Sequence, residues 1–117
     1  MGRLTTHVLD TARGRPAEGV GLALYRLSGG GRDRIAQAVT NADGRTEAPL
    51  LAGEALTPGR YELVFAAGDY LRATGQASAD LLFLDEIPIR FGVAEPQAHL
   101  HVPLLLSPFG YSTYRGS

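Results

Sequence analysis

Residues 20–27 read VGLALYRL, and this stretch decides the fold class because its apolar residues recur at every second position. In an extended chain successive side chains point to opposite faces, so Val20, Leu22 and Leu24 would all lie on the same side. Strict alternation of this kind is typical of a β-strand that buries one face in a core. The next residues, SGGGRD, favour a tight hairpin turn, since glycine adopts positive φ angles without steric cost. A hairpin with one buried face is therefore the first expectation.

The same period of two recurs on both sides of this hairpin. Loops rich in glycine, proline, asparagine and aspartate separate the alternating segments. The expected strands are residues 3–10, 20–27, 34–40, 60–67, 86–93, 98–106 and 110–116. Residues 11–19 and 50–59 read as loops, and Pro88 places its strand at a sheet edge because proline cannot donate a ladder hydrogen bond. Seven or eight short strands with regular turn signals predict an all-β antiparallel sandwich.

One segment, GDYLRATG at residues 68–75, is predicted to be helical. Asp69 has the side chain of an N-cap, whose oxygen accepts a hydrogen bond from an amide of the first turn. Gly75 suits the position just after a helix, where the backbone often turns left-handed. The expected helix spans about 69–75, which is roughly two turns.

Length and composition limit the possible architectures and partners. The 117 residues suit one domain spanning 1–117, and the apolar fraction of 44% with a charged fraction of 20% is ordinary for a globular protein. A net charge of −1 without a basic block argues against nucleic acid or an anionic membrane as a partner. The absence of cysteine excludes disulfides, thiolate nucleophiles and cysteine zinc sites. Without an apolar span or signal-peptide pattern, a cytoplasmic protein is expected.

The chain contains three histidines, and all of them lie off the apolar stripes of their expected strands. His7 alternates against Leu4 and Val8, while His99 and His101 are two residues apart and so point the same way. They therefore face solvent, another subunit or a site. Three interpretations remain open: scattered surface histidines, a three-histidine zinc site, or an acid–base pair, since imidazole titrates near neutral pH.

Two further segments carry polar groups where a loop or a chain end could present them. Arg45 follows Gly44 in the turn NADGRT, and its planar guanidinium suits an anionic or carbonyl-rich ligand. Taken alone, an arginine at such a place is more often a solvated loop residue. The final residues, YSTYRGS, bring aromatic, cationic and hydroxyl groups together, and Ser117 adds a hydroxyl beside an α-carboxylate. They form either an ordinary last strand or part of a site.

Four long segments resemble one known family. They are LTTHVLDTARGRPA near the beginning, NADGRTEAPLL after the third strand, GRYELVFAAGDYL before the helix, and HVPLLLSPFGYSTYRGS at the end. With these residues the chain resembles the 5-hydroxyisourate hydrolases, the transthyretin-related enzymes of urate breakdown, over essentially its whole length. The closing YRGS is the signature that separates these hydrolases from transthyretin, which resembles them in fold but carries thyroid hormone. Leu100, Phe109 and the segment FLDEIPI depart from common family residues, and none of them belongs to the implied site.

The resemblance implies a transthyretin-like β-sandwich of two four-stranded antiparallel sheets with one short helix. It also implies a homotetramer whose substrate sites lie in the channel where two dimers meet. The implied reaction is hydrolysis of 5-hydroxyisourate to 2-oxo-4-hydroxy-4-carboxy-5-ureidoimidazoline by general-base activation of water, with no metal and no other cofactor. A transthyretin-like carrier that binds a small aromatic ligand in the same channel is the alternative from another functional class.

The resemblance also assigns roles to individual residues of this sequence. The family's catalytic positions match His7, Arg45, His101 and Ser117. Tyr114 is expected to bind the substrate together with His7 and Arg45. Two residues are expected only to support the site: Arg115 and His99.

Overall fold

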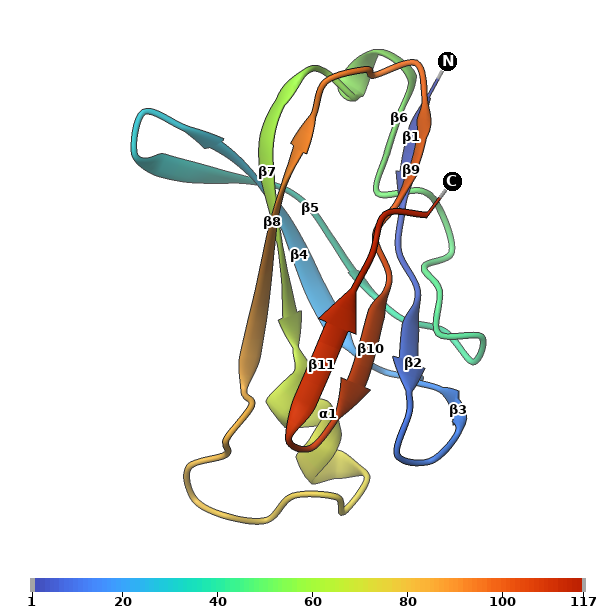
Figure 1. The fold of residues 1–117 in the computed structure, drawn as a ribbon, viewed down its shortest axis with the longest axis vertical. Coiled ribbons are helices and arrows are strands. Elements are labelled where there is room, and N and C mark those ends of the chain that lie inside the picture. Colours follow the sequence, from blue (N-terminus) through green and yellow to red (C-terminus); the bar gives the residue numbers. More distant parts are fainter. Residues whose placement is uncertain (1, 117) are drawn as a thin grey trace.

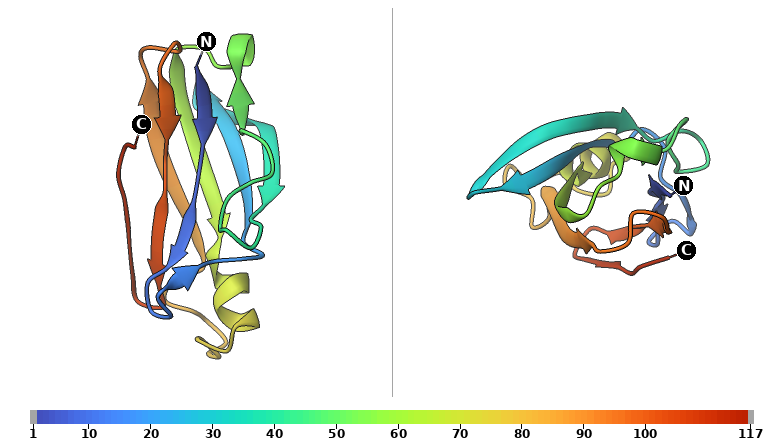
Figure 2. Two further views of the ribbon diagram at one scale, coloured as in Figure 1. Left: turned by 90° about the vertical axis from the view of Figure 1, so that its right-hand side faces the viewer. Right: turned by 90° about the horizontal axis from the view of Figure 1, so that it is seen from above.

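The strands pack face to face in two layers, and a short helix lies at one end of them (Figure 1). The computed structural model describes residues 2–116. The strands are β1 (Arg3–Thr5), β2 (Val8–Asp10), β3 (Arg15–Pro16), β4 (Gly21–Ser28), β5 (Gly31–Val39), β6 (Leu51–Ala52), β7 (Gly59–Ala66), β8 (Glu86–Val93), β9 (His99–His101), β10 (Leu104–Ser107) and β11 (Gly110–Thr113). The view from above in Figure 2 shows the two layers enclosing the core. The predicted β-sandwich with one short helix is confirmed.

The first layer is a four-stranded antiparallel sheet with the order β5-β4-β7-β8. Its centre forms where sequence alternation is strictest, and Tyr61, Leu63 and Phe65 of β7 are fully buried. The predicted stripe of Val20, Leu22 and Leu24 is confirmed as well, because all three side chains are buried in the core. The hairpin between β4 and β5 turns at Gly29 and Gly30, which both have positive φ angles. The expected edge position of β8 is also confirmed.

The second layer consists of two shorter sheets, with the orders β6-β1-β9 and β11-β10-β2-β3. Within it β1 pairs with β9, and β2 pairs with β10, in parallel, so this layer is not purely antiparallel. Each of the expected strands 3–10 and 98–106 is interrupted: the first forms β1 and β2, and the second forms β9 and β10. Two residues cause the break: Pro103 has no N–H to donate, and Thr6 uses its hydroxyl to occupy the Val102 carbonyl at 2.7 Å.

Two segments expected to be loops contain short strands. Residues 11–19 include β3, which pairs with β2, and residues 50–59 include β6 followed by a 3-10 turn at Gly53–Ala55. Strands of two residues are too short for an alternating pattern to show in the sequence. Their pairing depends on long-range contacts, which local sequence does not encode.

The helix α1 (Ala67–Ala73) begins two residues earlier than predicted. Its N-cap is Ala66, so the prediction of Asp69 as the N-cap is wrong, and Asp69 lies within the first turn. A backbone group replaces the side-chain cap, because the Gly68 amide donates to the carbonyl oxygen of Asp85 at 2.9 Å. A tertiary contact of this kind leaves no local trace in the sequence.

The other end of α1 follows the prediction. Gly75 has a φ of 74°, and its amide donates to the Arg72 oxygen, while the Gln76 amide donates to the Leu71 oxygen. These two bonds make a Schellman motif, in which glycine ends the helix in the left-handed region. The helix has seven residues, and no helix among residues 2–116 is long and apolar enough to cross a membrane.

One buried carboxylate, Glu62 of β7, is held between two arginines on the outer surface of the first layer. Arg90 donates to Glu62 Oε2 at 2.7 Å and Arg32 donates to Oε1 at 2.8 Å. The hydrogen bond from Arg90 lowers the pKa of Glu62, and Arg32 adds to this, although burial of the carboxylate opposes both. The stabilisation is therefore present at neutral pH and is lost when acid protonates the carboxylate through its lowered folded pKa.

Glu62→Gln is expected to lower the free energy of unfolding at neutral pH by about 1–3 kcal/mol, because two partly buried hydrogen bonds lose the charge of their carboxylate acceptor. The variant should also lose less stability than the parent between neutral and acidic pH, since it has no carboxylate to protonate there. Urea unfolding at both pH values measures this difference. Glu54→Gln, an exposed matched control, should follow the parent. An unchanged acid dependence in Glu62→Gln would contradict the prediction.

Candidate active site

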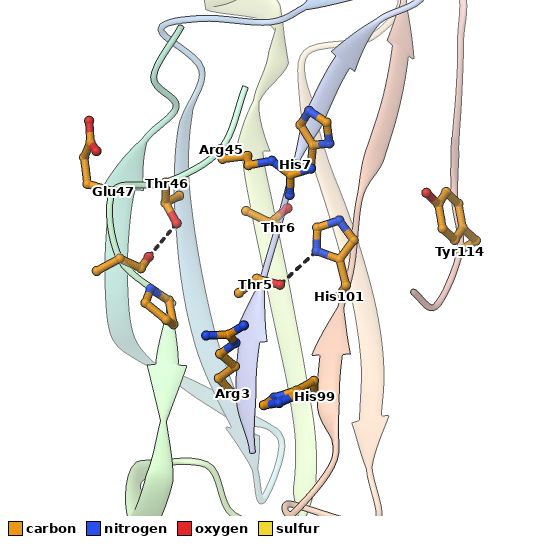
Figure 3. Close-up of a pocket in the computed structure, with 12 residues that line it drawn as sticks. Arg3, Thr5, Thr6, His7, Arg45, Thr46, Glu47, His99, His101 and Tyr114 are labelled. Atoms are coloured by element: carbon orange, nitrogen blue, oxygen red, sulfur yellow. Dashed lines mark hydrogen bonds between the residues drawn. The ribbon is translucent and has the colours of Figure 1, made fainter. Parts of the chain in front are cut away.

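A pocket of about 570 Å³ opens on the outer face of the second layer, where β1 runs beside β9 (Figure 3). It is lined by Arg3, Thr5, Thr6, His7, Arg45, Thr46, Glu47, Ala48, Pro49, His99, His101 and Tyr114. The histidines reach it because the alternating partners of their strands, Leu4, Val8 and Leu100, are buried on the core side. The predicted orientation of these strands is confirmed.

His7 lies between β1 and β2, where it pairs with Arg45 as an isolated β-bridge. The turn that carries Arg45 presses closely against this segment, since the Val8 amide donates to the Gly44 oxygen at 2.8 Å. Gly44 has a φ of 76°, and a Cβ there would meet the Val8 oxygen and approach His7 Cδ2 to 3.1 Å. Glycine is therefore required for the turn to place the guanidinium beside the imidazole.

One nitrogen of His7, Nε2, is buried and has no hydrogen-bond partner among residues 2–116. An unpaired buried polar atom costs free energy, and such atoms in native structures often belong to functional sites. The ring of His101 lies nearby, with its centroid 6.3 Å from that of His7 (Figure 3). The two imidazoles are therefore close enough to contact one small ligand together.

His101 is fixed on two sides by its own chain. Its Nδ1 lies 2.8 Å from Thr5 Oγ1, across the register of β1 and β9. Its backbone pairs with Gly116, which donates to the His101 oxygen at 2.7 Å and accepts from the His101 amide at 3.2 Å. The tail thus runs back along the strand that carries the histidine, and this contact orders it as far as the structure describes it.

Both imidazoles are shifted toward the neutral form. Burial lowers the pKa of His7, the positive charge of Arg45 lowers it further, and the carbonyl and carboxylate of Asp43 act in the opposite direction. Burial also lowers the pKa of His101, and the charges of Arg45 and His7 add to this effect. The neutral form of both rings is therefore favoured at neutral pH, and a neutral imidazole can accept a proton or donate a hydrogen bond.

The structure brings most of the predicted site residues together. The pocket contains five of them: His7, Arg45, His99, His101 and Tyr114. Arg115 does not line it; together with Tyr114 it lines a smaller neighbouring pocket that β8 also borders. The predicted role of Ser117 falls on a residue outside the described part of the chain, and it stays a prediction.

Seven pocket residues were not predicted, and Arg3, Thr5 and Glu47 are among them. Arg3 and Thr5 alternate in phase with His7, so the strand pattern already placed them on the same face. Glu47 belongs to the loop after Arg45, where no periodicity indicates the direction of a side chain. Among residues 2–116, no group of three or more histidine, aspartate or glutamate side chains is placed to hold a metal ion.

Gly116→Ala is expected to lower about tenfold the kcat of the hydrolysis that the family resemblance implies, because small displacements of a group that is predicted to be catalytic are costly. A Cβ at this position would lie 3.0 Å from Cδ2 and 3.1 Å from Cβ of His101, so the ring would have to move. Steady-state kinetics and thermal unfolding measure the effect on turnover and on folding separately. Gly110→Ala is the matched control on the same tail, because its Cβ would make an ordinary contact at 3.7 Å with Ser107. Equal kcat values for both variants would contradict the prediction.

Comparison with known proteins identifies the family. The model of the HIUase/Transthyretin family matches residues 4–116. The chain belongs to this family. A 5-hydroxyisourate hydrolase of Mesorhizobium japonicum is 63% identical over 116 residues, which cover 99% of this chain and 93% of that protein. The resemblance inferred from the sequence is thereby confirmed.

Solved structures of the HIUase/Transthyretin family superpose closely on the chain. An (S)-allantoin synthase is 48% identical with a TM-score of 0.93; the match covers 99% of this chain but only 44% of that longer one. Sea bream transthyretin in complex with thyroxine is 30% identical with a TM-score of 0.86, covering 97% of this chain and 94% of its own. The fold is therefore shared by family members of different function, and the residues of the pocket must distinguish them.

Proposed function

We propose that this chain is a 5-hydroxyisourate hydrolase of purine degradation that works as a cytoplasmic homotetramer. The observation that carries the proposal is the convergence of two imidazoles and one guanidinium in a single pocket. A carrier has no use for an acid–base pair, whereas hydrolysis of a cyclic amide needs both a proton acceptor and charge stabilisation. The names of the curated relatives support the same reaction.

The substrate is an oxidised purine with several carbonyl and N–H groups. A water oxygen forms a bond to an acyl carbon of the six-membered ring, the C–N bond breaks, and the water proton passes through the protein to the departing nitrogen. The imidazole pair of His7 and His101 orients this water, and one of the two rings accepts its proton. General-base assistance of this kind typically contributes about 10²–10⁴-fold. No covalent intermediate with the protein is needed.

Arg45 provides the positive charge of the site. Its planar guanidinium holds ring oxygens of the substrate and stabilises the negative charge that develops on the attacked carbonyl. Tyr114 packs against the substrate from the tail, and Ser117 assists the histidines. Arg115 and His99 support this arrangement from outside the reacting atoms.

The proposed tetramer places the pocket at a boundary between subunits. β8 and β11 stand at the ends of their sheets, so in the single chain each offers one edge without a ladder partner. Phe109 and Tyr111, beside the β11 edge, are 80% and 46% exposed, which is high for aromatic side chains. Sedimentation velocity tests the assembly, and a monomer at assay concentrations would contradict it.

The decisive experiment follows the absorbance of 5-hydroxyisourate generated in the cuvette by urate oxidase. The proposal predicts that catalytic amounts of this protein accelerate its decay beyond the spontaneous rate. Decay at the spontaneous rate, together with saturable binding of an aromatic ligand, would instead favour the transthyretin-like carrier. A chelator control addresses the zinc alternative, because full activity after metal removal excludes a requirement for metal.

A further inference from the structure

We propose that Thr5 is a positioning residue that holds His101 in the tautomer with its proton on Nε2. His101 then acts as a neutral hydrogen-bond donor to a substrate carbonyl, and His7 is left to accept the proton of water. This division of roles rests on the proposed hydrolase function and deepens it. Thr5 has no role implied by the family resemblance, and its contact with His101 appears only in the structure.

The contact is built into the strand register. Thr5 is the last residue of β1, and it lies directly opposite His101, the last residue of β9, in a parallel pair. The backbone between these positions is fixed, because the Val102 amide donates to the Thr5 oxygen at 3.0 Å. The side chains then meet at 2.8 Å between Thr5 Oγ1 and His101 Nδ1 (Figure 3). This is the ordinary length of a good hydrogen bond.

We assign the hydroxyl as the donor in this bond. Thr5 Oγ1 has no other hydrogen-bond acceptor among residues 2–116, so His101 Nδ1 is the protein acceptor for its proton. The neighbouring Thr6 behaves differently, since it is buried and donates to the Val102 carbonyl. The two consecutive threonines therefore have different hydrogen-bond partners: Thr6 pairs with a backbone carbonyl, and Thr5 pairs with the imidazole of His101.

An imidazole that accepts at Nδ1 carries its proton on Nε2 when it is neutral. Because Nδ1 is paired with Thr5, Nε2 is the ring nitrogen of His101 that is available to a ligand in the pocket. In this tautomer Nε2 carries the proton and can donate a hydrogen bond. The charges that reach this ring come from Arg45 and His7, and both disfavour its protonation. A neutral imidazole can stabilise a developing oxyanion by hydrogen bonding, but it cannot take a proton at a nitrogen that already holds one.

The first test is spectroscopic and uses no substrate. Protein labelled with ¹⁵N-histidine is studied by long-range ¹H–¹⁵N correlation above the pKa of His101. The parent and Thr5→Ser should show one His101 ring with Nε2 protonated and with Nδ1 shifted by an accepted hydrogen bond. Thr5→Val, which keeps the shape but lacks the hydroxyl, should lose that Nδ1 shift. Protonation at Nδ1 in the parent, or identical His101 spectra in Thr5→Val, would overturn the inference.

The second test is kinetic. Thr5→Val should lower kcat about tenfold with little change in KM, because only the orientation of a group that acts in the transition state is lost. Thr5→Ser should restore most of this loss. Thr11→Val is the matched control, because Thr11 lies outside the pocket. Its hydroxyl donates to the Leu106 oxygen at 3.0 Å, and the variant should keep the parental kcat. An unimpaired Thr5→Val, or a Thr5→Ser as impaired as Thr5→Val, would refute a role for the hydroxyl.

The two tests separate this inference from the proposed function. If the parent turns over 5-hydroxyisourate but carries the His101 proton on Nδ1, the tautomer assignment fails and the hydrolase proposal stands. If the parent shows the expected tautomer but no turnover, the contact with Thr5 stands and the division of catalytic roles fails together with the proposed function.

Discussion

His7→Ala and His101→Ala are each expected to lower kcat for 5-hydroxyisourate by about 10²–10³-fold, within the usual range for loss of acid–base assistance. The expectation follows from the pocket, where the neutral form of both rings is favoured and their centroids lie 6.3 Å apart. Either substitution removes a group that is proposed to contact the reacting atoms, so KM should change much less than kcat. The measurement is the decay of substrate absorbance after generation by urate oxidase.

His99→Ala provides the matched control for these variants. His99 belongs to the same strand as His101 and lines the same pocket, but it is exposed, and its proposed role is only supporting. Its kcat should stay close to the parental value, while sedimentation should show the same assembly in all three variants. Parental turnover in both His7→Ala and His101→Ala would refute the acid–base assignment. A loss of assembly would instead locate the defect in folding.

The faces of the strands could be predicted from the sequence because alternation is a local property. His7, His99 and His101 fall out of phase with the buried residues of their strands, and the structure places all three on the open side of the second layer. Arg45 could be predicted from its turn, because it directly follows Gly44 and loops of this kind commonly expose functional side chains. Such features can be predicted because they depend only on residues that are close together in the sequence.

The parts that could not be predicted depend on contacts between distant segments. The split of the second layer follows from Thr6 and Pro103, which are almost a chain length apart. The helix begins early because a residue after the helix, Asp85, satisfies its first turn. The contact of Thr5 with His101 and the pairing of Gly116 with the same histidine are equally long-range. These contacts fix the geometry of the site. Several of its residues could therefore be predicted from the sequence, but the contacts that hold them in place could not.

Arg45→Met is expected to lower kcat about 10²-fold or more, which is typical when one group that stabilises an oxyanion is removed. Methionine keeps the unbranched stem but has neither charge nor donors. The same variant should shift the acid limb of the pH–rate profile upward. The charge of Arg45 lowers the pKa of both His7 and His101, so its removal lets both values rise toward the ordinary range. The base is then lost to protonation at a higher pH than in the parent.

Arg45→Lys separates the two contributions of the guanidinium. Lysine retains the charge, so the acid limb should stay near its parental position, but it lacks the planar fork that holds two oxygens, so kcat should still fall. Arg60→Met, on an exposed arginine of the first layer, should change neither quantity. An acid limb that moves equally in Arg45→Met and Arg45→Lys would contradict an effect of charge on the histidines. An unchanged kcat in Arg45→Met would remove Arg45 from the mechanism, although the turn holds it beside His7.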